Sequence, residues 1–348
     1  MDVSCDVPLA PRTTLGVGGV ARRFGTVTSI DELRDALADA AAIGEPVLVL
    51  AGGSNLVVRD GGWHGLAVAI ALPGIAIVDD GDTATVTAAA GVVWDDLVAQ
   101  CLDAGLAGVE CLSGIPGLVG ATPMQNVGAY GQEVADTIEW VRVLDRHTGQ
   151  LETFRKAACG FAYRTSLFKG STRWIVVEVQ FRLARDRRAA PLRYPELSRA
   201  LGVADGGRAP LADVRRTVIE LRRGKGMVVD AADPESRSAG SFFVNPIVNS
   251  VQLAALESRL PAGTTMPRFA ASGGLTKLSA GWLIEHAGFA KGYTVGRVGI
   301  SRKHALALVN RGGATTTELL ALAHEIQQGV HAAFGIELVP EPVIVGVD

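Results

Sequence analysis

The feature that most constrains this chain is an uncharged, glycine-rich run from Cys111 to Gly131. The run contains no Asp, Glu, Lys or Arg, and its glycines stand at positions 114, 117, 120, 128 and 131. Glycine lets the backbone pass close to another group and adopt dihedral angles that other residues avoid. Such a run inside a folded chain is typical of main-chain N–H groups that surround a ligand, often an anionic one. A plain loop with turns at Ile115–Gly117 and near Pro123 is the alternative interpretation.

A second glycine run supports the ligand-binding interpretation. Pro46 to Leu50 has the pattern of a buried strand, and it leads directly into Gly52-Gly53-Ser54-Asn55. A third glycine cluster, Gly16 to Ala21, matches the dinucleotide pattern Gly-x-Gly-x-x-Ala, but no convincing strand precedes it. Because that pattern binds a dinucleotide only between a strand and a helix, we do not expect a Rossmann fold.

Length and composition indicate an ordinary folded protein with more than one domain. The chain has 348 residues, of which 48% are hydrophobic and 20% charged. Its formal net charge of −3 provides no basic surface for nucleic acid. We interpret the short basic clusters Arg185–Arg188 and Arg222–Lys225 as solvated faces.

Cysteine spacing and hydropathy predict a cytoplasmic protein without a membrane partner. Cys5, Cys101, Cys111 and Cys159 show no Cys-x-x-Cys spacing, which favours reduced thiols. The first residues do not have the pattern of a signal peptide. The longest apolar stretch, 66–78, is too short to span a bilayer.

Apolar periodicity predicts a chain of mixed helices and strands. Ser29 is expected to cap the first helix, with Glu32 three residues later completing a capping box. We expect helices at about 29–43, 94–102, 212–222, 278–286 and 316–334, and strands at 46–50, 56–58, 66–70, 84–90, 139–145, 174–183 and 305–309. These elements divide into three segments that end near residues 70, 210 and 348.

The residues alone provide few candidates for chemistry. No metal site is expected, because His324-Glu325 lacks the second histidine of a His-Glu-x-x-His helix. The sequence also contains no Gly-x-Ser-x-Gly motif for a serine nucleophile and no phosphate-binding loop. Three candidates remain: Arg164 in an aromatic patch, Ser241 after a glycine, and Glu341 between two prolines. Each also has an ordinary structural interpretation, as a packed arginine, a turn serine and a surface glutamate.

Six motifs follow one another along the chain: Leu50–Leu56, Ser113–Gly120, Gln125–Gly131, Tyr163–Ser166, Gly240–Pro246 and Pro340-Glu341. Taken together and in this order, they resemble the MurB family of UDP-N-acetylenolpyruvoylglucosamine reductases. The resemblance extends from about Thr13 to Gly346, and the segment Arg193-Tyr194-Pro-Glu-Leu is similar to the tyrosine-bearing loop of the type I members.

The resemblance implies an α+β fold and a bound FAD. A two-part FAD-binding domain of the PCMH/vanillyl-alcohol-oxidase-like type would occupy 1–70 and 71–210. A C-terminal α/β substrate-binding domain would occupy 211–348, and its last strand could return to the FAD-binding part. No lysine or arginine is expected to neutralise the flavin pyrophosphate nearby, so backbone N–H groups from Gly52 to Asn55 and from Ser113 to Gly120 are expected to hold it. The implied cofactor-binding residues are Gly52, Gly53, Ser54, Asn55, Ser113, Gly114, Ile115, Pro116, Gly117, Gly120, Gln125, Asn126 and Gly128.

The implied activity is reduction of an enolpyruvyl sugar nucleotide to UDP-N-acetylmuramate by NADPH through FAD, in peptidoglycan synthesis. Ser241 matches the family's proton donor, and Arg164 and Glu341 match its other two catalytic positions. The implied substrate-binding residues are Tyr163, Tyr194, Lys225, Arg237, Asn245 and His286. Lys225 and Arg237 are alternatives for the cation that binds the substrate diphosphate, and His286 replaces a glutamine of some relatives.

We expect a monomer whose partners are the sugar nucleotide and NADPH, although no motif encodes the preference for the phosphorylated nicotinamide cofactor. Two other functions are considered. One is another flavoprotein of the same fold, such as an oxidase, and the other is a non-catalytic protein that binds a sugar nucleotide or flavin. The presence of Ser241, Arg164 and Glu341 together argues against both.

Overall fold

The computed structural model describes residues 1–261 and 263–348, and residue contacts group them into two units. Unit 1 comprises Met1–Val7, Ala21–Gly52 and His64–Arg223. Unit 2 comprises Pro8–Val20, Gly53–Trp63 and Gly224–Asp348. The three-part division at residues 70 and 210 stays a prediction.

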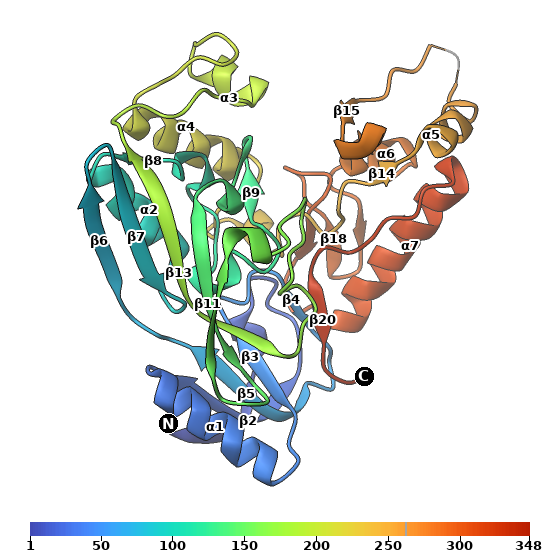
Figure 1. Cartoon of the computed structure of the whole chain (residues 1–348). Helices are drawn as coiled ribbons and strands as arrows, with labels where there is room; N and C mark the ends of the chain where they lie inside the picture. Colours follow the sequence, from blue (N-terminus) through green and yellow to red (C-terminus); the bar gives the residue numbers. More distant parts are fainter. Residues whose placement is uncertain (262) are drawn as a thin grey trace. The chain divides into compact units, whose positions relative to one another are not determined.

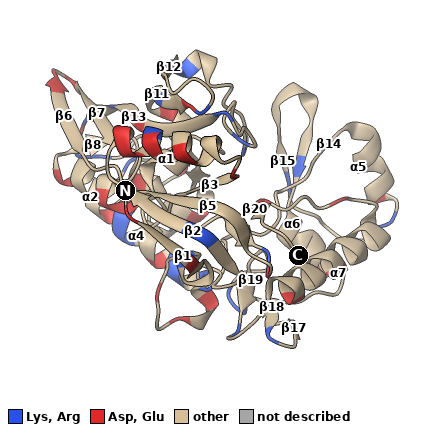
Figure 2. Ribbon diagram, turned by 90° about the horizontal axis from the view of Figure 1, so that it is seen from below, with Lys and Arg blue, Asp and Glu red and all other residues tan. Residues whose placement is uncertain are grey.

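A small sheet with one helix forms the first part of unit 1. Its strands are β1 (Val3–Pro8), β2 (Val20–Val27), β5 (Trp63–Ile70) and β3 (Val47–Leu50), in the order β1-β2-β5-β3. Helix α1 (Ile30–Ala42) buries Leu33 and Leu37, while Figure 2 shows charged residues of both signs along it. The Ser29 hydroxyl accepts the Glu32 N–H at 3.1 Å, which confirms the predicted cap.

A six-stranded sheet forms the second part of unit 1 (Figure 1). Five strands follow the order β12-β11-β13-β7-β6, and a short strand, β8, pairs with β13 in addition. Their bounds are β6 (Ile75–Asp80), β7 (Thr83–Ala89), β8 (Leu106–Ala107), β11 (Ile138–Asp145), β12 (Leu151–Arg155) and β13 (Trp174–Arg185). The strand pairs are antiparallel, so alternate residues of each strand can face one common core.

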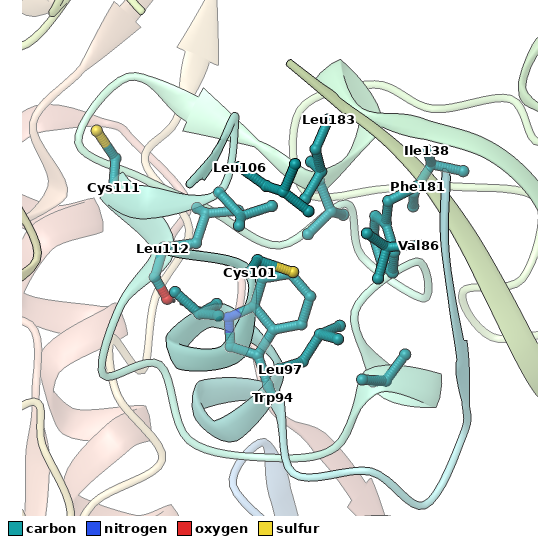
Figure 3. Packing of buried hydrophobic residues seen from close by; sticks show 14 of the residues in the cluster. Val86, Trp94, Leu97, Cys101, Leu106, Cys111, Leu112, Ile138, Phe181 and Leu183 are labelled. Carbon is teal, nitrogen blue, oxygen red and sulfur yellow. Dashed lines mark hydrogen bonds between the residues drawn. The ribbon is translucent and has the colours of Figure 1, made fainter. Parts of the chain in front are cut away.

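Helix α2 (Trp94–Asp103) supplies the centre of that core, as Figure 3 shows. The Trp94 ring is fully buried, and its centroid lies 5.9 Å from that of Phe181 on β13. A buried indole N–H needs an acceptor. Trp94 Nε1 donates to the Leu112 carbonyl at 3.0 Å, which ties the core to the start of the glycine-rich run. Cys101 lies in the same core as a free thiol, and burial raises its pKa to about 12.

Shorter elements complete unit 1. Helix α4 (Leu211–Gly224) buries Leu211, Val214 and Val218 along one side, as amphipathic periodicity predicts. The elements are the 3-10 turns η2 (Glu110–Leu112), η3 (Val119–Ala121), η4 (Val134–Asp136) and η5 (Lys156–Ala158), the strands β9 (Gly128–Ala129) and β10 (Gln132–Glu133), and the helices α3 (Pro195–Ala200) and α4 (Leu211–Gly224).

Unit 2 contains small sheets and the longest helix, α7 (Thr316–Phe334). The sheets have the orders β14-β16-β15, β17-β18-β19 and β20-β4. A capping box between Thr315 and Glu318 begins α7, and Asp60 accepts the N–H groups of Thr316 and Thr317 at 2.8 Å each. The other elements are η1 (Ala10–Arg12), β4 (Leu56–Val58), η6 (Pro234–Ser236), β14 (Ile247–Val248), α5 (Ser250–Glu257), β15 (Arg268–Ala270), η7 (Ser272–Gly274), β16 (Thr276–Leu278), α6 (Ala280–His286), β17 (Thr294–Val295), β18 (Val298–Ile300), β19 (Leu308–Asn310) and β20 (Val343–Val345).

Two predicted boundaries in unit 2 are wrong. The predicted strand 305–309 begins only at Leu308, because Ala305 to Ala307 form a turn in which the Ala307 N–H bonds to the His304 carbonyl at 3.2 Å. The helix predicted from Leu278 begins at Ala280, since Leu278 belongs to β16 and Ser279 caps the helix. No helix within the described ranges is long and apolar enough to cross a membrane.

Candidate functional site

The two glycine runs meet inside unit 1 at Gly52 and Gly117. Strand β3 ends at Leu50 and brings Gly52 against the second run, where a Cβ on Gly52 would lie 2.7 Å from the Gly117 Cα. The Gly117 carbonyl in turn accepts the Trp94 N–H at 3.0 Å, so the start of α2 fixes its position. Only residues without side chains allow this approach of two backbones. The ligand-binding interpretation requires such an arrangement.

Some backbone N–H groups of the two runs donate to acceptors within the chain, and others do not. Ser113, Gly114 and Gly120 donate to Glu110, Asp95 and Ala90 respectively, at 3.3, 2.6 and 3.0 Å. Across residues 1–261 and 263–348, no acceptor faces the N–H groups of Gly52, Ile115 and Gly117. Three free main-chain donors at one place fit an anionic group such as a pyrophosphate. The N–H groups of Ser113, Gly114 and Gly120 already have acceptors within the chain.

The first glycine run continues into unit 2. Gly53 has φ +62°, and a Cβ there would lie 2.0 Å from the Arg12 carbonyl oxygen, so only glycine fits. The Asn55 carbonyl accepts the Val343 N–H at 3.0 Å where β4 and β20 pair in parallel. The Asn55 side chain also donates to the Glu341 carbonyl at 3.4 Å. The residues after the first glycine run are therefore neighbours of the segment that carries Glu341.

A cation at the second run was missed by the sequence reasoning. Arg222 Nε donates to the Gly114 carbonyl at 3.2 Å, and burial lowers the pKa of Arg222. The interpretation of 222–225 as a solvated face is therefore wrong for Arg222, which is only partly exposed. The expectation that no arginine lies near the runs is also wrong. Arg215 and Arg222 are seven residues apart and so share one face of α4, which is the signal that could have indicated a common role.

Asp95 completes the contacts that fix Gly114. Its carboxylate accepts the Gly114 N–H at 2.6 Å and forms two hydrogen bonds with Arg215, at 2.7 and 2.8 Å. Burial alone would raise the pKa of Asp95, but the bonds from Arg215 and Gly114 outweigh it and hold the pKa below its usual value. Both backbone groups of Gly114 are thus fixed by charged side chains.

We expect Asp95→Asn to reduce the free energy of unfolding at pH 7 by roughly 1–3 kcal/mol, because Arg215 loses a partly buried charged partner. A carboxyl with a depressed folded pKa stabilises the protein above its unfolded pKa, and this contribution is lost as the pH falls through the folded pKa. The difference between the variant and the parent should therefore narrow below about pH 4. Urea unfolding at several pH values measures this.

The matched control is Asp213→Asn, which removes a more exposed pair with Arg216 on the same helix. Exposed pairs of this kind contribute about 0–1 kcal/mol. Equal losses in the two variants, or a difference that does not depend on pH, would contradict the role assigned to Asp95.

Arg164 lies against the end of the glycine-rich run in unit 1. Its Nη2 donates to the Gly128 carbonyl at 2.8 Å, and its guanidinium carbon lies 5.2 Å from the centre of the Tyr163 ring. The Lys169 ammonium donates to the Arg164 carbonyl at 2.9 Å. The structure therefore brings together Arg164, Tyr163 and Gly128 from the predicted site.

Ser241 and Glu341 lie on adjacent segments of unit 2. The Glu341 N–H donates to the Phe242 carbonyl at 2.8 Å, and the Phe242 N–H donates to the Leu306 carbonyl at 2.7 Å. Phe242 is fully buried, so it anchors the half-buried serine beside it. In the part of the chain that the structure describes, the Ser241 hydroxyl makes no hydrogen bond. This hydroxyl is available to a ligand.

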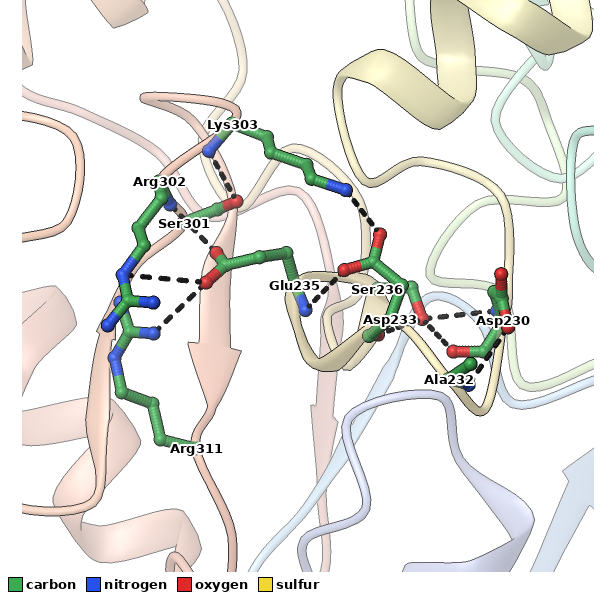
Figure 4. A network of polar contacts seen from close by, with 9 residues as sticks. All are labelled: Asp230, Ala232, Asp233, Glu235, Ser236, Ser301, Arg302, Lys303 and Arg311. Carbon is green, nitrogen blue, oxygen red and sulfur yellow. Dashed lines mark hydrogen bonds and ion pairs between the residues drawn. The ribbon is translucent and has the colours of Figure 1, made fainter.

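A buried carboxylate, also missed by the sequence reasoning, fixes the chain before Ser241 (Figure 4). Glu235 is 5% exposed and accepts the Arg302 N–H at 2.7 Å and Arg311 Nη1 at 3.2 Å. Next to it, Lys303 pairs with Asp233 at 2.8 Å. The partners of Glu235 lie far from it in the sequence, so no local pattern indicated this network. The network holds the turn from which the exposed Arg237 side chain extends.

The predicted substrate-binding residues are distributed over both units. In unit 1, the Tyr194 ring packs edge-on against Tyr130 with centroids 5.3 Å apart, and burial raises the pKa of Tyr194. In unit 2, the Asn245 side chain accepts the Ala280 N–H at 2.9 Å at the start of α6. His286 stacks on Trp282 of the same helix at 3.7 Å, and Lys225 is half-buried.

Comparison with known proteins identifies the family. Residues 233–345 match the model of the UDP-N-acetylenolpyruvoylglucosamine reductase C-terminal domain, and residues 21–155 match an FAD binding domain. A UDP-N-acetylenolpyruvoylglucosamine reductase from Thermobifida fusca is 53% identical over 347 residues, covering 98% of both chains. The chain belongs to the UDP-N-acetylenolpyruvoylglucosamine reductase (MurB) family.

Further MurB relatives agree. A reductase from Streptomyces coelicolor is 52% identical over 348 residues, covering 98% of this chain and 90% of its own. A crystal structure of MurB from Thermus caldophilus superposes with a TM-score of 0.67 at 28% identity, covering 99% of each chain. The predicted resemblance to the MurB family is confirmed. The α+β class, with an FAD-binding domain followed by a C-terminal domain, is also confirmed.

Proposed function

We propose that this chain reduces UDP-N-acetyl-3-O-(1-carboxyvinyl)-glucosamine to UDP-N-acetylmuramate with NADPH and a bound FAD, a step in peptidoglycan synthesis. The observation that carries this proposal is the match to named reductases at about half identity along the whole chain, 53% over 347 residues for Thermobifida fusca. We also propose that the protein is a monomer and that it is located in the cytoplasm.

The flavin site is assigned to the place where the two glycine runs meet. A bound FAD would supply the hydride transfer from NADPH to the terminal vinyl carbon of the substrate. The available N–H groups of Gly52, Ile115 and Gly117 would hold its pyrophosphate, since main-chain donors at one point stabilise an anion without a neighbouring charge. Arg222, bonded to the Gly114 carbonyl, adds a positive charge to this region. The other positions assigned to the cofactor are Gly53, Ser54, Asn55, Ser113, Gly114, Pro116, Gly120, Gln125 and Gly128.

Ser241 is assigned as the proton donor. Addition of a hydride to the terminal carbon leaves an electron pair on the carbon next to the carboxylate, and a proton must bind there to complete the product. A hydroxyl that makes no hydrogen bond within residues 1–261 and 263–348 is available for that transfer. Because a serine hydroxyl is a weak acid near neutral pH, the surrounding groups must stabilise the charge that develops.

Arg164 and Glu341 are assigned to that stabilisation. A guanidinium beside the substrate carboxylate would offset the negative charge that spreads onto it during hydride addition. Glu341 lies next to Phe242, one residue from Ser241, where it could orient the proton path. Arg164 belongs to unit 1 and the other two to unit 2. We assign all three to one reaction because each matches a motif of the family.

The sugar nucleotide is assigned to Tyr163, Tyr194, Asn245 and His286, with Lys225 or Arg237 as the cation for its diphosphate. Arginine and lysine both bind diphosphates, but only arginine does so through a planar pair of donors. Since both residue types bind a diphosphate, Lys225 and Arg237 stay alternatives.

The test uses the purified protein with its bound flavin. NADPH oxidation should be fast with the enolpyruvyl sugar nucleotide and slow without it, and one product should form for each NADPH consumed. Continuous oxygen consumption without the sugar nucleotide would favour an oxidase. Bound flavin that NADPH does not reduce would favour a binding protein.

A further inference from the structure

We propose that Asn126 is a positioning residue that holds the turn bearing Arg164 in place. This inference rests on the proposed function, in which Arg164 stabilises charge during sugar reduction. It assigns to Asn126 a role in that step instead of the contact with FAD that the family motif implies.

The side chain of Asn126 is fully used by the chain itself. Asn126 is 1% exposed, and its Nδ2 donates to Glu133 Oε2 at 2.7 Å and to the Ala162 carbonyl at 3.2 Å. Its Oδ1 accepts the Ala135 N–H at 3.1 Å. An amide group has two donor hydrogens, and both are occupied. Asn126 therefore has no side-chain donor left for a flavin, but it does bind the turn that contains Arg164.

That turn is tight and strained. Ala162 and Thr165 exchange backbone hydrogen bonds at 3.1 and 3.2 Å, so Tyr163 and Arg164 are its two central residues. Arg164 has φ +54°, a left-handed conformation that is unfavourable for a residue with a side chain. A strained turn of this kind persists only when neighbouring groups hold it.

One short stretch of the glycine-rich run supplies three anchors for the turn. Asn126 holds the carbonyl of Ala162, which begins the turn. The Met124 carbonyl accepts the Ser166 hydroxyl at 2.7 Å just after the turn, and the Gly128 carbonyl accepts the Arg164 guanidinium at 2.8 Å. The anchors alternate along the chain at positions 124, 126 and 128. The stretch therefore fixes the turn before, after and at the functional group of Arg164.

Gly128 and Glu133 complete the arrangement. A Cβ at Gly128 would lie 2.8 Å from Glu133 Cγ and 3.2 Å from Arg164 Nη1, so the guanidinium occupies space that any other residue would fill. Glu133 pairs with Gly128 between β9 and β10, and its carboxylate accepts a hydrogen bond from the Asn126 side-chain amide. Loss of the Asn126 amide would therefore free the Ala162 carbonyl at the start of the turn, and it would also remove the bond between Asn126 and Glu133.

The test separates the two half-reactions in the protein with bound flavin. Asn126→Gly removes the amide but accepts the positive φ of +47° at this position. We expect reduction of the sugar nucleotide by the reduced protein to slow by roughly 10- to 100-fold, because misplacing a charged group by about 1 Å has effects of that size. Flavin reduction by NADPH should change by less than about threefold, because Arg164 acts on the sugar substrate and not on NADPH.

A double-mutant cycle tests whether Asn126 acts through Arg164. In an Arg164→Ala background, Asn126→Gly should have almost no further effect on sugar reduction, since the group that it positions is gone. Ser166→Ala removes the anchor at Met124 and should give a smaller loss of the same kind. Its measurement keeps the proposal testable if Asn126→Gly folds poorly.

The matched control is Asp145→Asn in the same unit. Asp145 is 0% exposed and accepts two hydrogen bonds from Arg173, at 2.9 and 2.7 Å, so its variant also weakens the polar contacts of a buried side chain. We expect lower stability but equal effects on the two half-reactions. Equal slowing of both half-reactions in Asn126→Gly, or full additivity with Arg164→Ala, would overturn the inference. Normal sugar reduction in Arg164→Ala would instead overturn the role of Arg164 in the proposed function.

Discussion

Ser241→Ala is expected to slow reduction of the sugar nucleotide by about 10²- to 10⁴-fold, the usual contribution of a positioned general acid. NADPH should still reduce the bound flavin at the parent rate, because that step needs no proton from Ser241. Stopped-flow measurement of flavin absorbance during each half-reaction separates the two effects. The prediction depends on the Ser241 hydroxyl, which is half-buried and makes no hydrogen bond within the described residues.

Two further variants make the result specific. Ser258→Ala removes an exposed hydroxyl of the same unit and should leave both half-reactions unchanged. Ser241→Cys replaces the hydroxyl with a weaker donor of lower pKa, about 8.5. If it retains activity, sugar reduction should fall as the pH rises above the thiol pKa, because only the protonated thiol can donate. An equal fall of both half-reactions in Ser241→Ala would show that Ser241 is not the specific acid.

Local patterns allowed much of the secondary structure to be predicted. Ser29 caps α1 as the pattern indicates, and β4 has the bounds that its apolar residues predict. These signals are contained in a few neighbouring residues, so no knowledge of the tertiary fold is needed. The capping box expected from Glu32 is wrong, because the Glu32 carboxylate accepts the Thr28 N–H at 2.7 Å. The apolar residues Ala305–Ala307 resemble a strand, so the sequence pattern predicts one there. They form a turn instead, because the His304 carbonyl and ring nitrogen accept the N–H groups that follow.

The supports of the candidate site could not be predicted in the same way. Asp95 and Arg222 meet at Gly114 although they lie 19 and 108 residues from it in the sequence. Asn126 likewise reaches Ala162, 36 residues away. Such contacts depend on how α2, α4 and the turn at Arg164 pack, and the sequence of one chain does not encode that packing as a local pattern. The family motif indicated that Asn126 matters, but only its hydrogen bonds indicate what it holds.

A second large effect is expected at Gly52, where the two glycine runs touch. In Gly52→Ala, the new Cβ would lie 2.7 Å from the Gly117 Cα, so the backbones themselves must separate. Overpacking of this kind costs about 1–3 kcal/mol, which corresponds to roughly 5- to 150-fold weaker flavin binding if the strain falls on the cofactor site. The measurement is the flavin content of the purified protein and the loss of flavin on dilution.

Gly224→Ala is the matched control for this substitution. A Cβ on Gly224 would meet no atom within 4 Å, and no positive φ opposes a side chain there, so the variant should retain its flavin. The thermal unfolding midpoints of both variants, measured with excess FAD, separate a local effect from general destabilisation. If Gly52→Ala retained flavin as the parent does, the meeting point of the two runs would not be the pyrophosphate site. The free N–H groups of Ile115 and Gly117 would then require another ligand.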